Sequence, residues 1–282
     1  MAWGGSAKWG FSLMINSLRL AATAAALTVA AAASAGVPFD VRYETEKAGL
    51  QNTTATFSVG GVETFDKLDV VDQTTFKTAF GTSGEITGVY SNVRILEADQ
   101  YGGAGGKGNY AVTFSEKGYS LDLYSSIKGG VNYFGYWLSA LDQGNRITFY
   151  SHDKVLFTFD PTDVLKAVEK NGDAKKYYGN PNGNFAGKNG GEPYIFLNFF
   201  NDGGSFDKVV FQETPERGGY ESDNHTVGHF LKKGTGTSID LNPESFPGAG
   251  AVPEPATWGM LLAGFGLVGI SARRRRPSVV AA

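Results

Sequence analysis

The 282-residue sequence contains no cysteine and only three histidines. The absence of cysteine excludes disulfide bonds, thiolate zinc sites, iron–sulfur clusters and cysteine nucleophiles. Charged residues are also scarce, at 19%, whereas aromatic residues reach 13%. That aromatic content argues against a disordered chain, and the length allows one large domain or two ordinary ones.

Charge is distributed unevenly along the chain. Residues 1–35 hold two basic residues and no acidic one, and residues 253–282 hold four arginines and one glutamate. The middle segment, residues 36–252, therefore carries 19 basic and 27 acidic residues, a net charge of −8. A segment this acidic repels phosphate backbones, so the composition argues against nucleic-acid binding.

The N-terminal segment has the layout of a secretory signal peptide. Arg19 precedes an apolar, alanine-rich stretch, and small residues then occupy alternate positions. A buried alanine-rich helix is the alternative interpretation, but nothing polar marks an opposite face. The predicted cleavage site consists of Ala33, Ala35 and Gly36.

The C-terminal segment combines three features in order. Pro253-Glu254-Pro255 and Trp258 come first, and residues 256–272 are seventeen positions without charge. At ~1.5 Å per residue this stretch is just enough to cross a hydrocarbon layer of ~30 Å. The segment ends in four consecutive arginines, which are Arg273, Arg274, Arg275 and Arg276. Arginines stay on the cytoplasmic side, so we predict a transmembrane helix with the preceding domain outside the inner membrane. A hydrophobic core helix is the alternative, but such helices seldom end in four arginines.

This arrangement resembles the PEP-CTERM sorting signal, and the form with Trp258, PEPATW, resembles the variant common in alphaproteobacteria. The resemblance implies that an exosortase, a membrane protease-transferase, recognises the tripeptide, removes the helix and releases or attaches the protein at the cell surface. Physically, the two prolines hold Glu254 in an extended segment, which suits the cleft of a processing enzyme.

The middle segment is predicted to be a β domain, because short aromatic and β-branched runs alternate with glycine, asparagine and aspartate. The ten predicted strands cover residues 53–59, 86–96, 110–114, 119–124, 133–140, 146–150, 154–159, 194–200, 206–211 and 220–227. Loops 141–145 and 151–153 are short enough to join three strands into an antiparallel meander, and residues 201–204 have hairpin-turn chemistry.

One helix interrupts the strands. It is predicted to begin at Asp160-Pro161, where the aspartate can cap, and to end at Asn171-Gly172. We therefore predict an all-β fold, an antiparallel β-sandwich of the jelly-roll type with one short helix.

The predicted domain organisation has five parts. These parts are a signal peptide (1–35), a β-sandwich surface domain (36–246), a linker (247–252), a sorting signal with a transmembrane helix (253–277) and a tail (278–282). Translation is predicted to start at Met1 or at Met14.

Several stretches of the β domain resemble a family of exosortase-dependent surface proteins that has no assigned enzymatic activity. They are FGYW at 134–137, SALD at 139–142, GN at 144–145, YGNP at 178–181, FDKV at 206–209 and ESDN at 221–224. This resemblance implies a location and a fold, not a reaction.

Two familiar motifs are present without the context that they require. Residues 103–108 match the dinucleotide pattern GxGxxG, but a strand is predicted after them where that pattern needs a helix. His225 and His229 have the HxxxH spacing, yet on a strand they would lie ~13 Å apart, too far for one metal ion. We therefore expect a loop at the first motif and no metal site at the second.

The carboxylates of the last predicted strand admit a catalytic interpretation. Glu221 and Asp223 would share one strand face, as would Asp223 and His225, and glycoside hydrolases need an acid paired with a base or nucleophile. A solvated sheet face is the alternative. Oxygen-rich turns at Asn201-Asp202 and Asp223-Asn224 suit calcium, although hairpin chemistry explains the first. Trp137 is expected in the core rather than on a sugar-binding surface.

The prediction for function is an exported bacterial surface or extracellular-matrix protein without catalytic, cofactor or metal residues. Its precursor is anchored transiently in the inner membrane, an exosortase processes it, and its β-sandwich has a structural or adhesive duty at the envelope, in exopolysaccharide or in biofilm. One alternative is a carbohydrate-binding module, with or without calcium. A further alternative is an enzyme that acts on extracellular glycan through Glu221, Asp223 or neighbouring residues.

Overall fold

The computed structural model describes residues 39–44, 53–141, 143–160, 162–172, 174–242 and 245–246, together with Phe265. All of them belong to the unit Val37–Ala282. Among these residues, no helix is both long and apolar enough to span a bilayer. The signal peptide, the linker and, apart from Phe265, the predicted transmembrane helix lie outside the described part of the chain, so those boundaries stay predictions.

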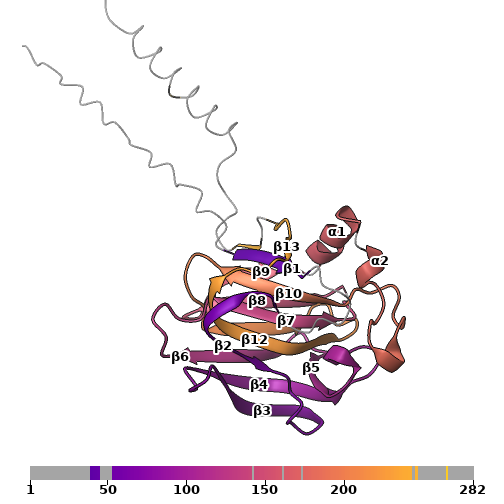
Figure 1. Cartoon of the computed structure of the whole chain (residues 1–282), viewed down its shortest axis with the longest axis horizontal. Coiled ribbons are helices and arrows are strands. Elements are labelled where there is room, and N and C mark those ends of the chain that lie inside the picture. The colour runs from indigo at the N-terminus through magenta and orange to yellow at the C-terminus, as the bar shows by residue number, and fades with distance from the viewer. Residues whose placement is uncertain are drawn as a thin grey trace, which may run out of the picture. The chain divides into compact units, whose positions relative to one another are not determined.

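Strands dominate the described residues, and all of their pairings are antiparallel (Figure 1). The strands are β1 (Phe39–Tyr43), β2 (Thr56–Glu63), β3 (Val71–Phe80), β4 (Ile86–Glu97), β5 (Asn109–Thr113), β6 (Tyr119–Ser125), β7 (Tyr133–Ser139), β8 (Asn145–Ser151), β9 (Lys154–Phe159), β10 (Ile195–Asn201), β11 (Lys208–Glu213), β12 (Tyr220–Lys232) and β13 (Thr237–Ser238). The helices are α1 (Thr162–Lys170) and α2 (Ala174–Tyr177), with single 3-10 turns η1 (Ala104–Gly106) and η2 (Gly183–Phe185).

The strands form two layers. The hydrogen-bonded order is β13-β1-β10-β7-β12-β5-β4-β6-β11-β8-β9, with β2 beside β12 and β3 beside β4. The order turns back at β5, which pairs with both β12 and β4. We call β13-β1-β10-β7-β12-β2 the first layer and β9-β8-β11-β6-β4-β3 the second layer. The predicted antiparallel sandwich is thereby confirmed.

Aromatic rings fill the space between the layers. Rings of the first layer meet rings of the second with centroids 4.7 to 5.9 Å apart, and the pairs are Phe39 with Phe157, Phe199 with Phe149, and Phe134 with Phe211. Period-two alternation produces this core, because β1 buries every second residue and leaves the others partly exposed. β7 and β10 are buried along their whole length, so their outer face is covered as well.

The predicted helix is confirmed as α1. The carboxylate of Asp160 accepts hydrogen bonds from the backbone N–H and the hydroxyl of Thr162, both at 2.9 Å. Val164 and Val168 pack into the core, and Gly172 ends the helix with a φ of +69°. The helices lie at the β13–β1 edge, where Asn171 donates to the hydroxyl of Tyr43 at 2.9 Å (Figure 1).

Two predicted connections are wrong. β7 pairs with β10 and β12 in the first layer, whereas β8 belongs to the second, so only β8 and β9 form a hairpin of the expected meander. Residues 202–207 likewise cross from β10 in the first layer to β11 in the second instead of making a hairpin turn. Glycine and asparagine permit a tight turn locally, but they do not decide which strand becomes the neighbour.

Candidate functional site

The residues predicted for sorting and cleavage all lie outside the described part of the chain. They are Pro253, Glu254, Pro255, Trp258, Arg273, Arg274, Arg275, Arg276, Ala33, Ala35 and Gly36. The described domain does show where the chain departs toward the sorting signal. Phe246 stacks on Phe157 with ring centroids 4.8 Å apart, and six residues separate it from Pro253.

His225 lies inside the aromatic core. Its Nδ1 is 3.0 Å from the hydroxyl of Tyr90, and its ring stacks on Phe211 with centroids 5.2 Å apart. Burial lowers the pKa of His225 to about 3, so the ring is neutral. His229 lies further along β12, as expected for a strand, and its Nδ1 is 2.8 Å from the carbonyl oxygen of Gly130. His225 therefore packs inside the aromatic core, whereas His229 contacts the backbone at Gly130.

A β-bulge separates Asp223 from His225. Between Asp223 and Thr226, β12 has one residue more than its partner β7, and Asn224 adopts a φ of +49°. The extra residue resets the alternation of side chains, so Asp223 and His225 face opposite sides of the first layer. The prediction that they share a face is wrong for this reason.

Asp223 lies beneath the loop that contains η1. One carboxylate oxygen accepts the backbone N–H of Ala104 at 2.8 Å, the other accepts that of Asn224 at 2.6 Å, and the residue is 3% exposed. Burial raises the pKa of Asp223 to about 8, although the two N–H donors act in the opposite direction. Glu221 is also buried. A polymeric substrate does not reach either carboxyl in this conformation.

The outer face of the first layer carries a small apolar cluster of its own. Trp137 is 2% exposed, so its predicted burial is confirmed, but it belongs to this cluster rather than to the main core. The cluster consists of Ala104, Trp137, Ala140, Tyr194 and Phe196. Tyr194 links this cluster to the residues that cover it, because its hydroxyl donates to the carbonyl oxygen of Gln100 at 2.7 Å and accepts from the side-chain amide of Asn189.

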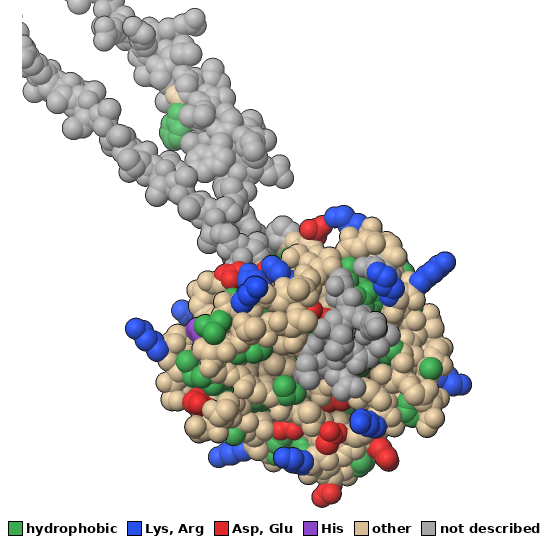
Figure 2. Space-filling model, in the orientation of Figure 1, with side chains coloured by type: hydrophobic (Ala, Val, Ile, Leu, Met, Phe, Trp, Pro, Cys, Tyr) green, Lys and Arg blue, Asp and Glu red, His purple; other side chains and the backbone are tan. Residues whose placement is uncertain are grey.

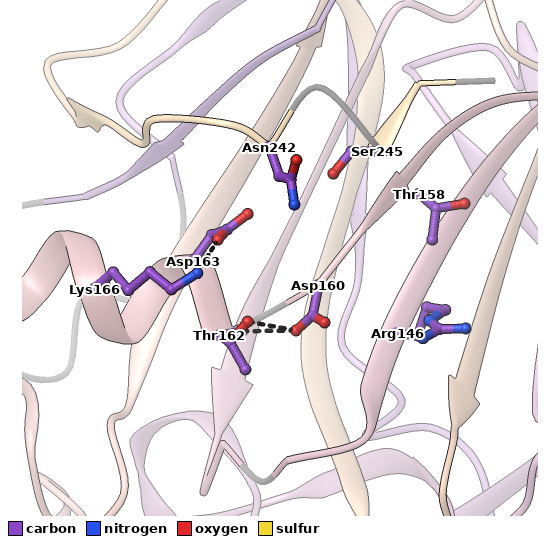
Figure 3. Close-up of a pocket in the computed structure, with 8 residues that line it drawn as sticks. All are labelled: Arg146, Thr158, Asp160, Thr162, Asp163, Lys166, Asn242 and Ser245. Carbon is purple, nitrogen blue, oxygen red and sulfur yellow. Dashed lines mark hydrogen bonds and ion pairs between the residues drawn. The ribbon is translucent and has the colours of Figure 1, made fainter. Parts of the chain in front are cut away.

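A polar hollow of about 320 Å³ opens between β8–β9, the start of α1 and the segment after β13 (Figure 3). Strands β8 and β9 contribute Arg146 and Thr158 to its lining. The segment around the start of α1 contributes Asp160, Thr162, Asp163 and Lys166, and the segment after β13 contributes Asn242 and Ser245.

Asp163 is the buried group of this hollow. Its side chain is 8% exposed, and one oxygen accepts from the ammonium of Lys166 at 3.0 Å. The other oxygen has no hydrogen-bond partner among the described residues, and it points toward Asn242 (Figure 3). A buried acceptor without a donor is unfavourable unless a ligand or water supplies one.

Further polar groups of the hollow are also available. The guanidinium of Arg146 makes no hydrogen bond or ion pair with the described residues. Asp160 uses only one of its two carboxylate oxygens, the one that accepts from Thr162. The sequence analysis missed this site, because it treated Asp160 only as the residue that begins the helix. The isolated Arg146 in an otherwise uncharged strand was the one available signal.

The described residues contain no cluster of side chains that is arranged to bind a metal ion. No group of three or more histidine, aspartate or glutamate side chains is placed there to hold an ion. At one of the two turns considered for calcium, Asp202 accepts from the ammonium of Lys233 at 2.6 Å. At the other turn, the backbone donors to Asp223 already occupy both of its oxygens.

Comparison with known families identifies the C-terminal segment. Residues 251–276 match the family model of the PEP-CTERM protein-sorting motif. The chain carries a PEP-CTERM sorting signal. This match confirms the resemblance based on Pro253-Glu254-Pro255 and the arginine cluster. The PEP-CTERM motif indicates an exported protein with a membrane-anchored precursor that an exosortase processes.

Other comparisons add little to the PEP-CTERM match. No curated protein matches the chain. Among solved structures, a glycoside hydrolase family 43 arabinoxylan arabinofuranohydrolase from Bacillus subtilis, in complex with cellotetraose, is similar at 12% identity with a TM-score of 0.30. The similarity covers 57% of this chain and 28% of that enzyme. At this level it implies no shared function.

Proposed function

We propose that the β-sandwich is the working part of a bacterial surface or extracellular-matrix protein, with a structural or adhesive duty and no catalytic activity. The PEP-CTERM match at residues 251–276, directly after this domain, carries the proposal. An exosortase acts on the exported precursor while the C-terminal helix anchors it in the inner membrane. The mature form then resides at the cell surface or in the matrix.

The domain suits display on a tether. β1 at its start pairs with β13 near its end, in the register Tyr43 with Thr237, so the chain enters and leaves at one edge. The remaining surface is free to face outward. On the face that Figure 2 shows, charged side chains of both signs are interspersed, and hydrophobic side chains form only small patches between polar ones. Such a surface favours solubility outside the membrane.

A non-catalytic role is supported by the position of the carboxyl groups considered for glycan cleavage. Glu221 and Asp223 are both buried, Asp223 beneath the η1 loop, and a polysaccharide does not reach either carboxyl. In addition, His225 is neutral and enclosed by aromatic rings, so it is not placed to exchange protons with a substrate.

Deletion of residues 253–255 tests the sorting step. We expect the deletion variant to keep the size of the membrane-anchored precursor and to be absent from the surface. A matched deletion of residues 278–280 in the tail serves as the control and should mature normally. Immunoblots of membrane, surface and medium fractions measure both. Unchanged maturation and display of the first variant would contradict the proposal.

Deletion of the domain tests its duty. A chain that lacks residues 39–246 but keeps both terminal segments should still be exported, whereas cell attachment and matrix cohesion should fall to the level of a strain without the protein. Equal attachment by this variant and the full chain would show that the β-sandwich has no adhesive or structural role.

A further inference from the structure

We propose that the hollow between β8–β9, the start of α1 and the segment after β13 binds a neutral sugar residue of a surface glycan. The inference deepens the adhesive role proposed above and rests on it. It starts from three properties of this hollow: its balanced charge, its unused hydrogen-bonding groups and its size.

The charges that the described residues bring to the hollow are balanced. Among them, Arg146 and Lys166 contribute two positive charges, and Asp160 and Asp163 contribute two negative ones. A phosphate or uronate would meet two carboxylates, and a divalent cation would meet a guanidinium and an ammonium. Neither kind of ion is favoured over its opposite. A neutral ligand with many polar groups has no such conflict.

The unused groups match the chemistry of hydroxyls. The buried free oxygen of Asp163 lacks a donor, and the second oxygen of Asp160 and the guanidinium of Arg146 are free to bind a ligand. A sugar hydroxyl donates one hydrogen bond and accepts others at the same time. Neighbouring hydroxyls of one ring can therefore serve carboxylate and guanidinium together, which water does less specifically because each molecule must be ordered separately.

The size fits one sugar unit with room to continue. The hollow of about 320 Å³ is at the low end of the range for small-molecule sites, ~300–1,000 Å³. A second hollow of about 250 Å³ shares Asp163 and Lys166 with it and continues along α1 to Ser238 of β13. The two hollows together accommodate a short stretch of an oligosaccharide chain.

The lining also predicts weak binding at each site. Among the described residues, no aromatic side chain lines either hollow, so none of them stacks on a sugar ring. A surface protein present in many copies compensates through multivalent contact with a repeating polymer. The expected ligand is accordingly a neutral polysaccharide rather than a free monosaccharide.

The test uses the full chain in detergent and three probes: an array of short neutral oligosaccharides, alginate as a polyuronate, and calcium chloride. Asp163→Asn and Arg146→Ala are the site variants, and the exposed Asp72→Asn and Arg217→Ala are their matched controls. We expect binding to neutral glycans that each site variant weakens roughly tenfold or more, because Asp163→Asn replaces a charged acceptor by a neutral amide and Arg146→Ala removes the guanidinium donors. The controls should bind as the unaltered chain does.

Thermal unfolding of each variant confirms that it is folded, and a variant that fails to fold is replaced by Asp160→Asn, whose side chain is exposed. Absence of neutral-glycan binding, or equal binding by folded site variants and controls, overturns the sugar site. Binding of alginate or calcium that the site variants abolish overturns it as well. If surface display and attachment persist in any of these cases, the sugar site alone fails and the surface function stands.

Discussion

Asp223 and His225 lie two residues apart on one strand and face opposite sides of it. The bulge at Asn224 produces this arrangement, which places a carboxyl under the η1 loop and an imidazole between aromatic rings. Burial shifts the two pKa values in opposite directions, to about 8 for Asp223 and about 3 for His225. Each shift favours the neutral form of its group, so both make the stability of the domain depend on pH.

Asp223→Asn should reduce the decline in the free energy of unfolding that we expect as the pH rises above neutral. The folded carboxyl keeps its proton up to a pKa of about 8, whereas the unfolded one has a pKa of ~3.9. Its contribution is therefore complete below pH ~4 and is lost as the pH rises through about 8. The variant has no carboxyl to titrate but keeps only one of the two acceptor oxygens, so the comparison is of slopes: between neutral and alkaline pH its free energy of unfolding should fall by roughly 1–2 kcal/mol less than that of the unaltered chain. Urea unfolding at neutral and alkaline pH measures this, and Asp72→Asn is the exposed control. A decline of the same size in both variants would contradict the buried carboxyl as its source.

His225 should make the domain less stable at acid pH, the opposite of the effect of Asp223. Its pKa of about 3 lies below the unfolded value of ~6.5, so its contribution is present above pH ~6.5 and is lost as the pH falls toward 3. Because Asp223 acts in the reverse sense over part of that range, the measurement belongs in the Asp223→Asn background. There, His225→Phe should flatten the acid side of the stability profile. A profile that keeps its slope would assign the acid sensitivity to other groups.

Tyr90 and His225 should behave as a coupled pair. His225→Phe leaves the hydroxyl of Tyr90 buried without its 3.0 Å partner, at a cost of about 1–3 kcal/mol. Adding Tyr90→Phe removes the stranded hydroxyl and should recover part of that cost. Denaturant unfolding of both single variants and the double variant gives the coupling energy. Purely additive effects would mean that the hydrogen bond contributes nothing to stability.

Asn224 should tolerate glycine but not alanine. Its φ of +49° lies in the left-handed region, which costs an ordinary side chain roughly 1–2 kcal/mol. Asn224→Ala should therefore lower the free energy of unfolding by about that amount, and Asn224→Gly, the matched control, should change it less. Equal losses would place the importance of Asn224 in its side chain instead of its backbone.

Phe211 should be among the most costly core positions. From β11 its ring meets Phe134 and Tyr136 of the first layer, at centroid distances of 5.9 and 5.3 Å. Phe211→Ala should cost about 3–5 kcal/mol, whereas Tyr124→Ala, on an exposed side chain, should stay within about 0.5 kcal/mol. Shifts of the urea midpoint give both values, and similar shifts would contradict the central place of Phe211 in the core.

Sequence patterns predicted most of the strands because burial on one face leaves alternating or continuous apolar runs. β3 escaped prediction because, along an edge of the second layer, it keeps few residues buried and is rich in threonine. β1 escaped because five residues give a weak signal, although its alternation is regular. The crossings between layers after β7 and β10 were mistaken for turns within a layer, because neighbour choice depends on distant strands.

The polar hollow could not be predicted from local patterns. Arg146 and Asp163 are seventeen positions apart in the sequence, and Asn242 comes from beyond the last strand. Only the packing of α1 across the end of β8–β9 brings them together. The bulge at Asn224 was similarly invisible, since a single inserted residue leaves the apolar pattern of β12 almost unchanged. The sorting signal was the opposite case, because its features are contiguous.

The short β13 and the ring of Phe246 have a mechanical consequence. β13 pairs with β1 at two positions, and Phe246, which rests on Phe157, is the last described core residue before the tether. Tension on the C-terminal side of the domain would therefore act first on this ring and on the two-residue β13, before it reaches the longer strands of either layer.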